Sequence, residues 1–166
     1  DALSRFSSIP LDYPDTEFAP KAQFKTALVY EKMGEIDISV EEYVKLAYKY
    51  PDCEYIPEVM SRLGGYFQAR GLELKVQSDP LREKEDAESQ GMVLKSMAEA
   101  AVEFGRAAQV FAKLERRFPE HALAGLAGLR AAQNYMRAED YATAIAAFER
   151  TIENETYDGR EIRAQA

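Results

Sequence analysis

The sequence predicts an all-α fold: an α-α superhelix of antiparallel helix pairs with one long inserted helix. Two observations lead to this prediction. An eight-residue turn occurs twice, 37 residues apart, as YPDTEFAP at 13–20 and YPDCEYIP at 50–57. Small and aromatic residues recur at helical spacing before and after each copy. A repeat of about 20–50 residues is typical of proteins that stack short helical units into a solenoid.

The first segment, 1–13, is expected to be the second helix of a repeat. Ala2, Phe6 and Ile9 are spaced four and three residues apart, so they lie on one face of a helix. Because no first helix precedes it, we expect the sequence to be a fragment of a longer solenoid, truncated at both ends.

The next repeat, 14–50, is expected to contain both helices of a pair. Pro20 falls in the first turn of the first helix, where proline is tolerated, and Gly34 suits a left-handed cap at its end. The helices would approach through small residues beside aromatic ones, which are Ala27 with Tyr30 and Ser39 with Tyr43.

The third segment, 51–118, is a repeat with an insertion at about 72–106. Its first helix is expected to contain Gly64 and Phe67 and to end at Gly71. Beyond it, Asp79 and Pro80 form a good helix start, as N-cap and first helical residue. Apolar residues then recur at intervals of three and four, which predicts one long helix over 80–118.

Two properties of that insertion leave alternatives open. Gly91 could kink the long helix or split it into two. The charged run at 82–86, REKED, would project from the solenoid. A charge run of this kind is usually a solvated extension, and the alternative is a docking arm for a partner.

The last repeat, 119–155, follows Pro119, and 156–166 is expected to start a further one. Its small and aromatic pairs are Ala132 with Tyr135 and Ala144 with Phe148. Thr151 and Thr156 stand where the earlier cycles have an aliphatic residue and the turn proline, so the pattern weakens here.

These small and aromatic positions resemble the tetratricopeptide repeat, whose usual period is about 34 residues. The repeated turn and the insertion resemble, more narrowly, outer-membrane assembly lipoproteins of the BamD/YfiO type and Tol-Pal coordinators. The broader resemblance implies a protein-binding scaffold. The narrower one implies a periplasmic or outer-membrane-associated protein, with a cytoplasmic location as the alternative and with a lipid anchor upstream left open.

Composition excludes several other classes. The net charge is −8, with −4 in each half, so a basic stripe for nucleic acid is not expected. Apolar runs are too short for a membrane-spanning helix, which needs about 20 residues. Cys53 and His121 fall at the same position of the repeated turn and lack companions at catalytic or metal-ligand spacing. We therefore predict no enzyme, no metal and no cofactor.

The remaining candidate site is the concave face. The resemblance implies that first-helix residues at fixed offsets line a groove for a peptide or helix of a partner. These are Lys21, Phe24, Leu28, Glu31, Glu58, Ser61, Gln68, Leu129, Gln133, Met136 and Arg137. The Lys and Asn pair with which some relatives hold a carboxylate is absent, so a carboxylate clamp is not expected. The alternative function is a structural spacer or an oligomerisation module with possible self-association.

Overall fold

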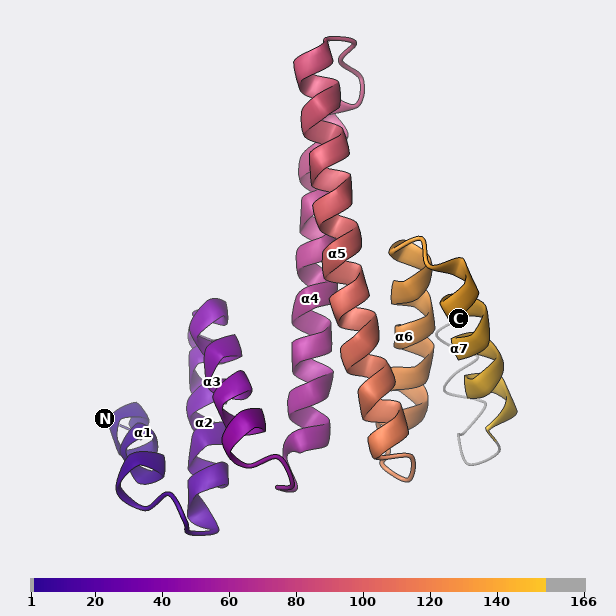
Figure 1. The fold of residues 1–166 in the computed structure, drawn as a ribbon. Coiled ribbons are helices and arrows are strands. Elements are labelled where there is room, and N and C mark those ends of the chain that lie inside the picture. The colour runs from indigo at the N-terminus through magenta and orange to yellow at the C-terminus, as the bar shows by residue number, and fades with distance from the viewer. Residues whose placement is uncertain (1, 155–166) are drawn as a thin grey trace. The chain divides into compact units, whose positions relative to one another are not determined.

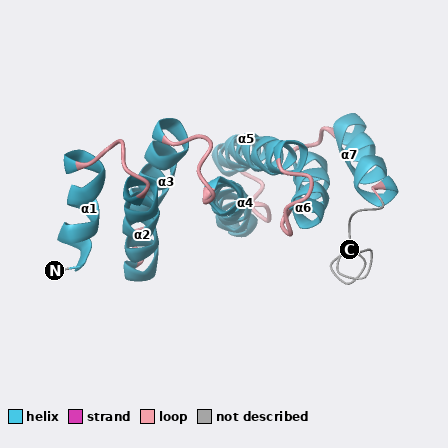
Figure 2. Ribbon diagram, turned by 90° about the horizontal axis from the view of Figure 1, so that it is seen from below, coloured by secondary structure: helices cyan, strands magenta, loops and turns pink. Residues whose placement is uncertain are grey.

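The computed structural model describes residues 2–154, and within this range the chain forms seven α-helices, one 3₁₀ helix and no strand (Figure 2). The all-α, tetratricopeptide-like fold class is confirmed. The chain divides into two compact units, residues 1–59 and 60–166, which we describe one at a time. The further repeat expected at 156–166 lies outside the described residues, and the division into repeats stays a prediction.

The first unit contains α1 (Ala2–Asp12), α2 (Phe18–Met33), α3 (Ile36–Lys49) and the first residues of α4 (Ile56–Ser78). Small residues bring α2 and α3 together, since Ala27 is fully buried and its carbonyl accepts a 2.9 Å hydrogen bond from the Ser39 hydroxyl. Phe24 fills the space beside them, stacked on Tyr55 with ring centroids 4.8 Å apart.

The turn prolines and Gly34 lie at the helix ends where the sequence predicts them. Pro14, Pro51 and Pro119 each follow the end of a helix, and Pro20 and Pro57 fall in the first turns of α2 and α4. Proline fits there because the first backbone N–H groups of a helix have no partner within it. Gly34 ends α2 with φ of +81°, which confirms the predicted left-handed cap.

The second unit contains most of α4, followed by η1 (Asp79–Leu81), α5 (Ala87–Arg117), α6 (Ala124–Arg137) and α7 (Tyr141–Glu153). The prediction that a helix ends at Gly71 is wrong. Gly71 lies inside α4, where a Cβ would come within 2.7 Å of the Phe104 ring. The glycine permits close approach of α4 and α5 and does not cap a helix.

The predicted long helix is confirmed in its continuity and wrong at its start. It passes through Gly91 without a break, but it begins at Ala87. Because α4 continues to Ser78, Asp79 and Pro80 form a 3₁₀ turn in the connection. Asp86 is the N-cap: it accepts a 2.7 Å hydrogen bond from the Ser89 N–H, which holds the pKa of its carboxyl below the usual value.

In the second unit, α4 and α5 form a hairpin that extends beyond α6 and α7 (Figure 1). The Ser96 hydroxyl of α5 donates to the carbonyl of Leu74 on α4 at 2.9 Å. The charged run at 82–86 lies in the loop at the far end of this hairpin, and not on a helix as predicted.

A buried polar cluster joins α5, α6 and α7. The Glu115 carboxylate is 3% exposed and forms a 2.7 Å ion pair with Arg150. It also accepts a 3.3 Å hydrogen bond from the Thr151 hydroxyl. Gly128 faces this cluster, and a Cβ there would lie 2.5 Å from a Glu115 oxygen. The Thr151 hydroxyl also donates a shorter hydrogen bond, of 2.8 Å, to the Ala147 carbonyl of its own helix, so threonine is satisfied at this buried position.

Candidate functional site

The predicted groove residues of the first unit differ in exposure. Phe24 is only 4% exposed, because it packs against Tyr43 and Tyr55. Glu31 accepts a 2.8 Å hydrogen bond from the Tyr43 hydroxyl. Lys21 is exposed, and two more are half-buried, namely Leu28 and Glu58. Phe24 therefore supports the fold, and it leaves the set of side chains we expect to contact a partner.

In the second unit, Leu129 is 3% exposed and leaves the set for the same reason. Gln68 on α4 accepts a 3.0 Å hydrogen bond from the Asn134 amide on α6, which links the two helices. Ser61 and Gln133 are half-buried. The other two predicted residues of this unit, Met136 and Arg137, are exposed, and both line a cleft.

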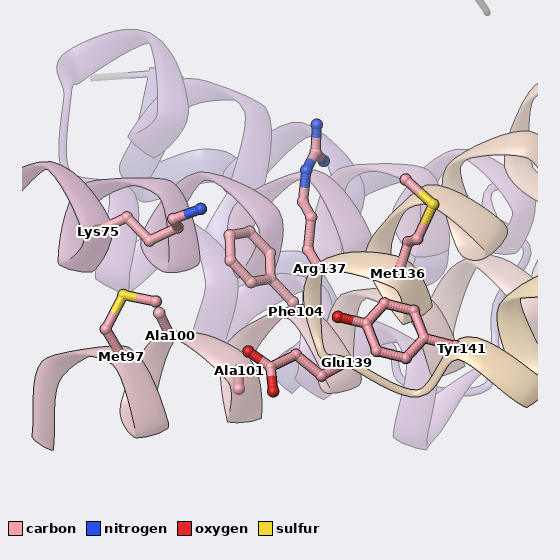
Figure 3. Close-up of a pocket in the computed structure, with 9 residues that line it drawn as sticks. All are labelled: Lys75, Met97, Ala100, Ala101, Phe104, Met136, Arg137, Glu139 and Tyr141. Carbon is pink, nitrogen blue, oxygen red and sulfur yellow. The ribbon is translucent and has the colours of Figure 1, made fainter. Parts of the chain in front are cut away.

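This cleft, which we call the hairpin cleft, has a volume of about 210 Å³ and lies where the α4 and α5 hairpin meets the end of α6 (Figure 3). Its lining residues are Lys75 of α4, Met97, Ala100, Ala101 and Phe104 of α5, Met136 and Arg137 of α6, Glu139 of the following turn, and Tyr141 of α7. All of them belong to the second unit.

The floor of the hairpin cleft is firmly packed and has almost no accessible surface of its own. Phe104 and Ala100 are each 1% exposed. Phe104 is fixed from behind by the close approach of Gly71, described above. The Arg137 guanidinium lies 5.8 Å from the centroid of the Phe104 ring, in cation–π range. The floor is therefore part of the core of the unit and is preformed.

The rim of the hairpin cleft carries charges of both signs. In Figure 3, Lys75 and Arg137 lie on one side of the floor, while Glu139 and the Tyr141 hydroxyl lie on the other. Within the described part of the chain, Lys75, Arg137 and Glu139 form no ion pair. These charges are thus available to a bound molecule.

Glu139 has an unusual backbone conformation. Its φ is +63°, and among the described residues it is the one non-glycine residue with positive φ. Its N–H donates to Met136, and the Asp140 N–H donates to Tyr135, which together close the end of α6. Gly34 closes α2 with the same pair of hydrogen bonds. A glutamate therefore occupies a position that favours glycine.

Sequence reasoning missed most of this cleft. Lys75, Met97 and Phe104 come from the insertion and its junction, where no repeat counterpart exists for comparison. A signal did exist for Glu139, because it stands 105 residues after Gly34, the same offset that separates Ala27 from Ala132. Aligning the cycles would have shown an acidic residue at a glycine cap.

A second, more open cleft lies in the first unit between the two copies of the repeated turn. It measures about 520 Å³ and is lined by residues of 14–20 and 49–53. Cys53 lies in it, and burial raises the pKa of its thiol, which disfavours the reactive thiolate. His121 is an exposed turn residue whose ring nitrogen accepts from the Leu123 N–H at 3.2 Å. Across residues 2–154 no group of side chains suits a metal ion.

The fold and the cleft together define a helix-pair repeat protein with a preformed surface recess. Residues 21–52 and 126–155 match the family model of the tetratricopeptide repeat. No curated protein matches the chain, and the narrower resemblance to outer-membrane assembly lipoproteins stays a prediction. No helix within residues 2–154 has the length and apolar character needed to cross a bilayer.

Proposed function

We propose that this chain is a non-enzymatic protein-binding module that holds a segment of a partner protein in the hairpin cleft and on the adjoining surface of α6. Tetratricopeptide repeats typically serve protein–protein interaction, and the matched segments include α6. The observation that carries the proposal is a preformed recess with the half-exposed Met136 at its edge and with charges without ion-pair partners around it.

The composition of the surface supports this proposal. Met136 is 50% exposed at the edge of the cleft, and Arg137 and Tyr141 adjoin it. Methionine, arginine and tyrosine are enriched at the centres of protein interfaces. A partner that covers Met136 would also exclude water from the neighbouring charges, which strengthens their interactions.

A display selection with random peptides on the immobilised protein tests the proposal. Enriched peptides should bind in fluorescence anisotropy, and Met136→Asp should weaken binding about tenfold or more. Met92→Asp is the matched control, because Met92 is similarly exposed, at 45%, on α5 outside the cleft. Equal affinities of the wild type and Met136→Asp, or no enriched peptide, would contradict the proposal.

A second candidate function, the oligomerisation module, is favoured by the outer face of α7. Ile145 and Ile152 lie seven residues apart on this helix, on one face, and are 58% and 76% exposed. Light scattering over a concentration series tests it. Self-association that Ile145→Asp abolishes would support this function, and a monomer at all concentrations would contradict it.

A cell-envelope setting is a further part of the proposal and rests on the resemblance of the repeated turn. Fractionation of cells that express the full-length protein tests it. Recovery with the periplasm or outer membrane is expected, and recovery with the cytosol would contradict it.

A further inference from the structure

The charges around the hairpin cleft indicate what kind of segment it selects. We propose that the hairpin cleft binds a partner segment in which a large apolar residue lies between an acidic and a basic residue. This inference rests on the proposed function, because it requires that a partner segment enters the cleft.

The apolar residue is matched to two methionines of the cleft. Met136 is 50% exposed and Met97 is partly exposed, so both present thioether surface that gains from burial, whereas Phe104 beneath them is already buried. The volume of about 210 Å³ is smaller than the roughly 300–1,000 Å³ typical of sites that enclose a whole small molecule. One inserted side chain, presented by a longer segment outside the cleft, fits this size better.

The acidic residue is required by Lys75 and Arg137. These two side chains reach the same side of the floor from different helices, α4 and α6 (Figure 3). Arg137 already lies over the Phe104 ring, so its charge is held at the edge of the apolar surface. A carboxylate beside the inserted apolar residue would meet both cations, and part of each pair would be shielded from water.

The basic residue is required by Glu139. Its carboxylate faces the other side of the floor, in the direction of Ala101 (Figure 3). The left-handed backbone at Glu139 is strained for a residue with a Cβ, and glycine would avoid this strain. Strained residues of this type concentrate at functional sites, where the side chain has a use. A cation of the partner gives this carboxylate its counterpart.

Charge reversal at Glu139 is the decisive experiment. The probe is the same random peptide library, selected in parallel on the wild type, on Glu139→Lys and on Glu149→Lys. Glu149 is exposed on α7 and lies outside the cleft, so it gives a matched change of net charge. Wild type and Glu149→Lys should enrich peptides with an acidic, a large apolar and a basic residue in that pattern.

On Glu139→Lys the basic preference should become an acidic one, while the preference for the first acidic residue persists. A wild-type peptide and its copy with the basic residue replaced by Glu should then exchange rank, each by about tenfold in Kd. Glu139→Gln keeps the backbone strain and the side-chain shape, and it should lose the basic preference without gaining an acidic one. Thermal unfolding by circular dichroism confirms that each variant is folded.

The outcomes separate this inference from the proposed function. Enriched peptides without charge preference whose binding is still lost in Met136→Asp would overturn the inference and support the proposed function. Identical peptides on the wild type and Glu139→Lys would do the same. Enrichment of acidic residues without basic ones would show that only Lys75 and Arg137 select the peptide, which also overturns the inference. An absence of any enriched peptide would overturn both.

Discussion

The two helix pairs that match the repeat model, α2 with α3 and α6 with α7, have related backbones and different polar interactions. Residues of one correspond to residues of the other at an offset of 105. In the first pair, Tyr43 donates to Glu31 across the pair at 2.8 Å. In the second pair, Phe148 and Met136 stand at these positions, so this hydrogen bond cannot form.

This difference places corresponding side chains of the two pairs in different surroundings. Glu31 is used inside its own helix pair, whereas its counterpart Met136 is half exposed at the hairpin cleft. Gly34 caps α2 without strain, whereas its counterpart Glu139 holds a strained backbone and carries a charge to the cleft. At these two positions the first pair has a hydrogen bond and an unstrained cap, whereas the second pair has side chains that line the cleft.

The largest predicted effect concerns Gly128 and its counterpart in the first pair, Gln23. Gly128→Ala would place a Cβ 2.5 Å from both Glu115 and Thr151, so the buried ion pair must shift. We expect a loss of about 2–3 kcal/mol in the free energy of unfolding, after a gain of up to about 1 kcal/mol in helix propensity. Urea unfolding followed by circular dichroism measures it.

Gln23→Ala is the comparison for that prediction. It removes one side-chain hydrogen bond to Glu42 and creates no clash, so its expected cost is about 1 kcal/mol. If Gly128→Ala proved as stable as the wild type, the polar cluster of the second pair would be looser than its contacts indicate.

The exchange of the two caps should have opposite effects. Gly34→Glu should destabilise the chain by about 1–2 kcal/mol, because it forces a side chain into the left-handed conformation. Glu139→Gly should stabilise it by up to about 1 kcal/mol, since the strain is relieved while the flexible glycine favours the unfolded chain. Thermal midpoints measure both. A destabilised Glu139→Gly would show that the carboxylate stabilises the native state.

The sequence predicted those parts of the fold that local chemistry determines. Proline and glycine restrict the backbone whatever surrounds them, which is why the turn prolines and the cap at Gly34 were predicted correctly. The prediction of a helix end at Gly71 was wrong because glycine also permits close packing of helices. Only the position of Phe104 on another helix distinguishes a packing glycine from a capping one.

The site was less predictable for a related reason. The repeat pattern located Met136 and Arg137, but exposure depends on which neighbours cover a residue, and the pattern could not show that Phe24 and Leu129 are buried. Lys75 reaches the cleft only because α4 continues past Gly71 into the hairpin. Its place in the site follows from tertiary packing and not from the repeat.

The hydrogen bond across the first pair gives a smaller and more specific effect. Tyr43→Phe should destabilise the chain by about 1 kcal/mol, because Glu31 loses a donor. Phe148→Tyr alone should not stabilise the second pair, whereas Phe148→Tyr combined with Met136→Glu should restore the missing bond. The coupling energy of this double-mutant cycle, from urea unfolding, is the measurement. Coupling near zero would mean that the two pairs differ in geometry as well as in side chains.

The smallest effect is expected at the start of the second helix in each pair. Asp140 caps α7 by accepting a 3.2 Å hydrogen bond from the Thr143 N–H, while its counterpart Glu35 makes no side-chain cap to α3. Asp140→Ala should therefore cost about 0.5–1 kcal/mol, and Glu35→Ala should cost less than half as much. Hydrogen exchange of the first amides of α7 and α3 measures the fraying. Equal losses of stability in Asp140→Ala and Glu35→Ala would show that the cap hydrogen bond of Asp140 adds no stability. Packing within each pair would then determine where the helices start.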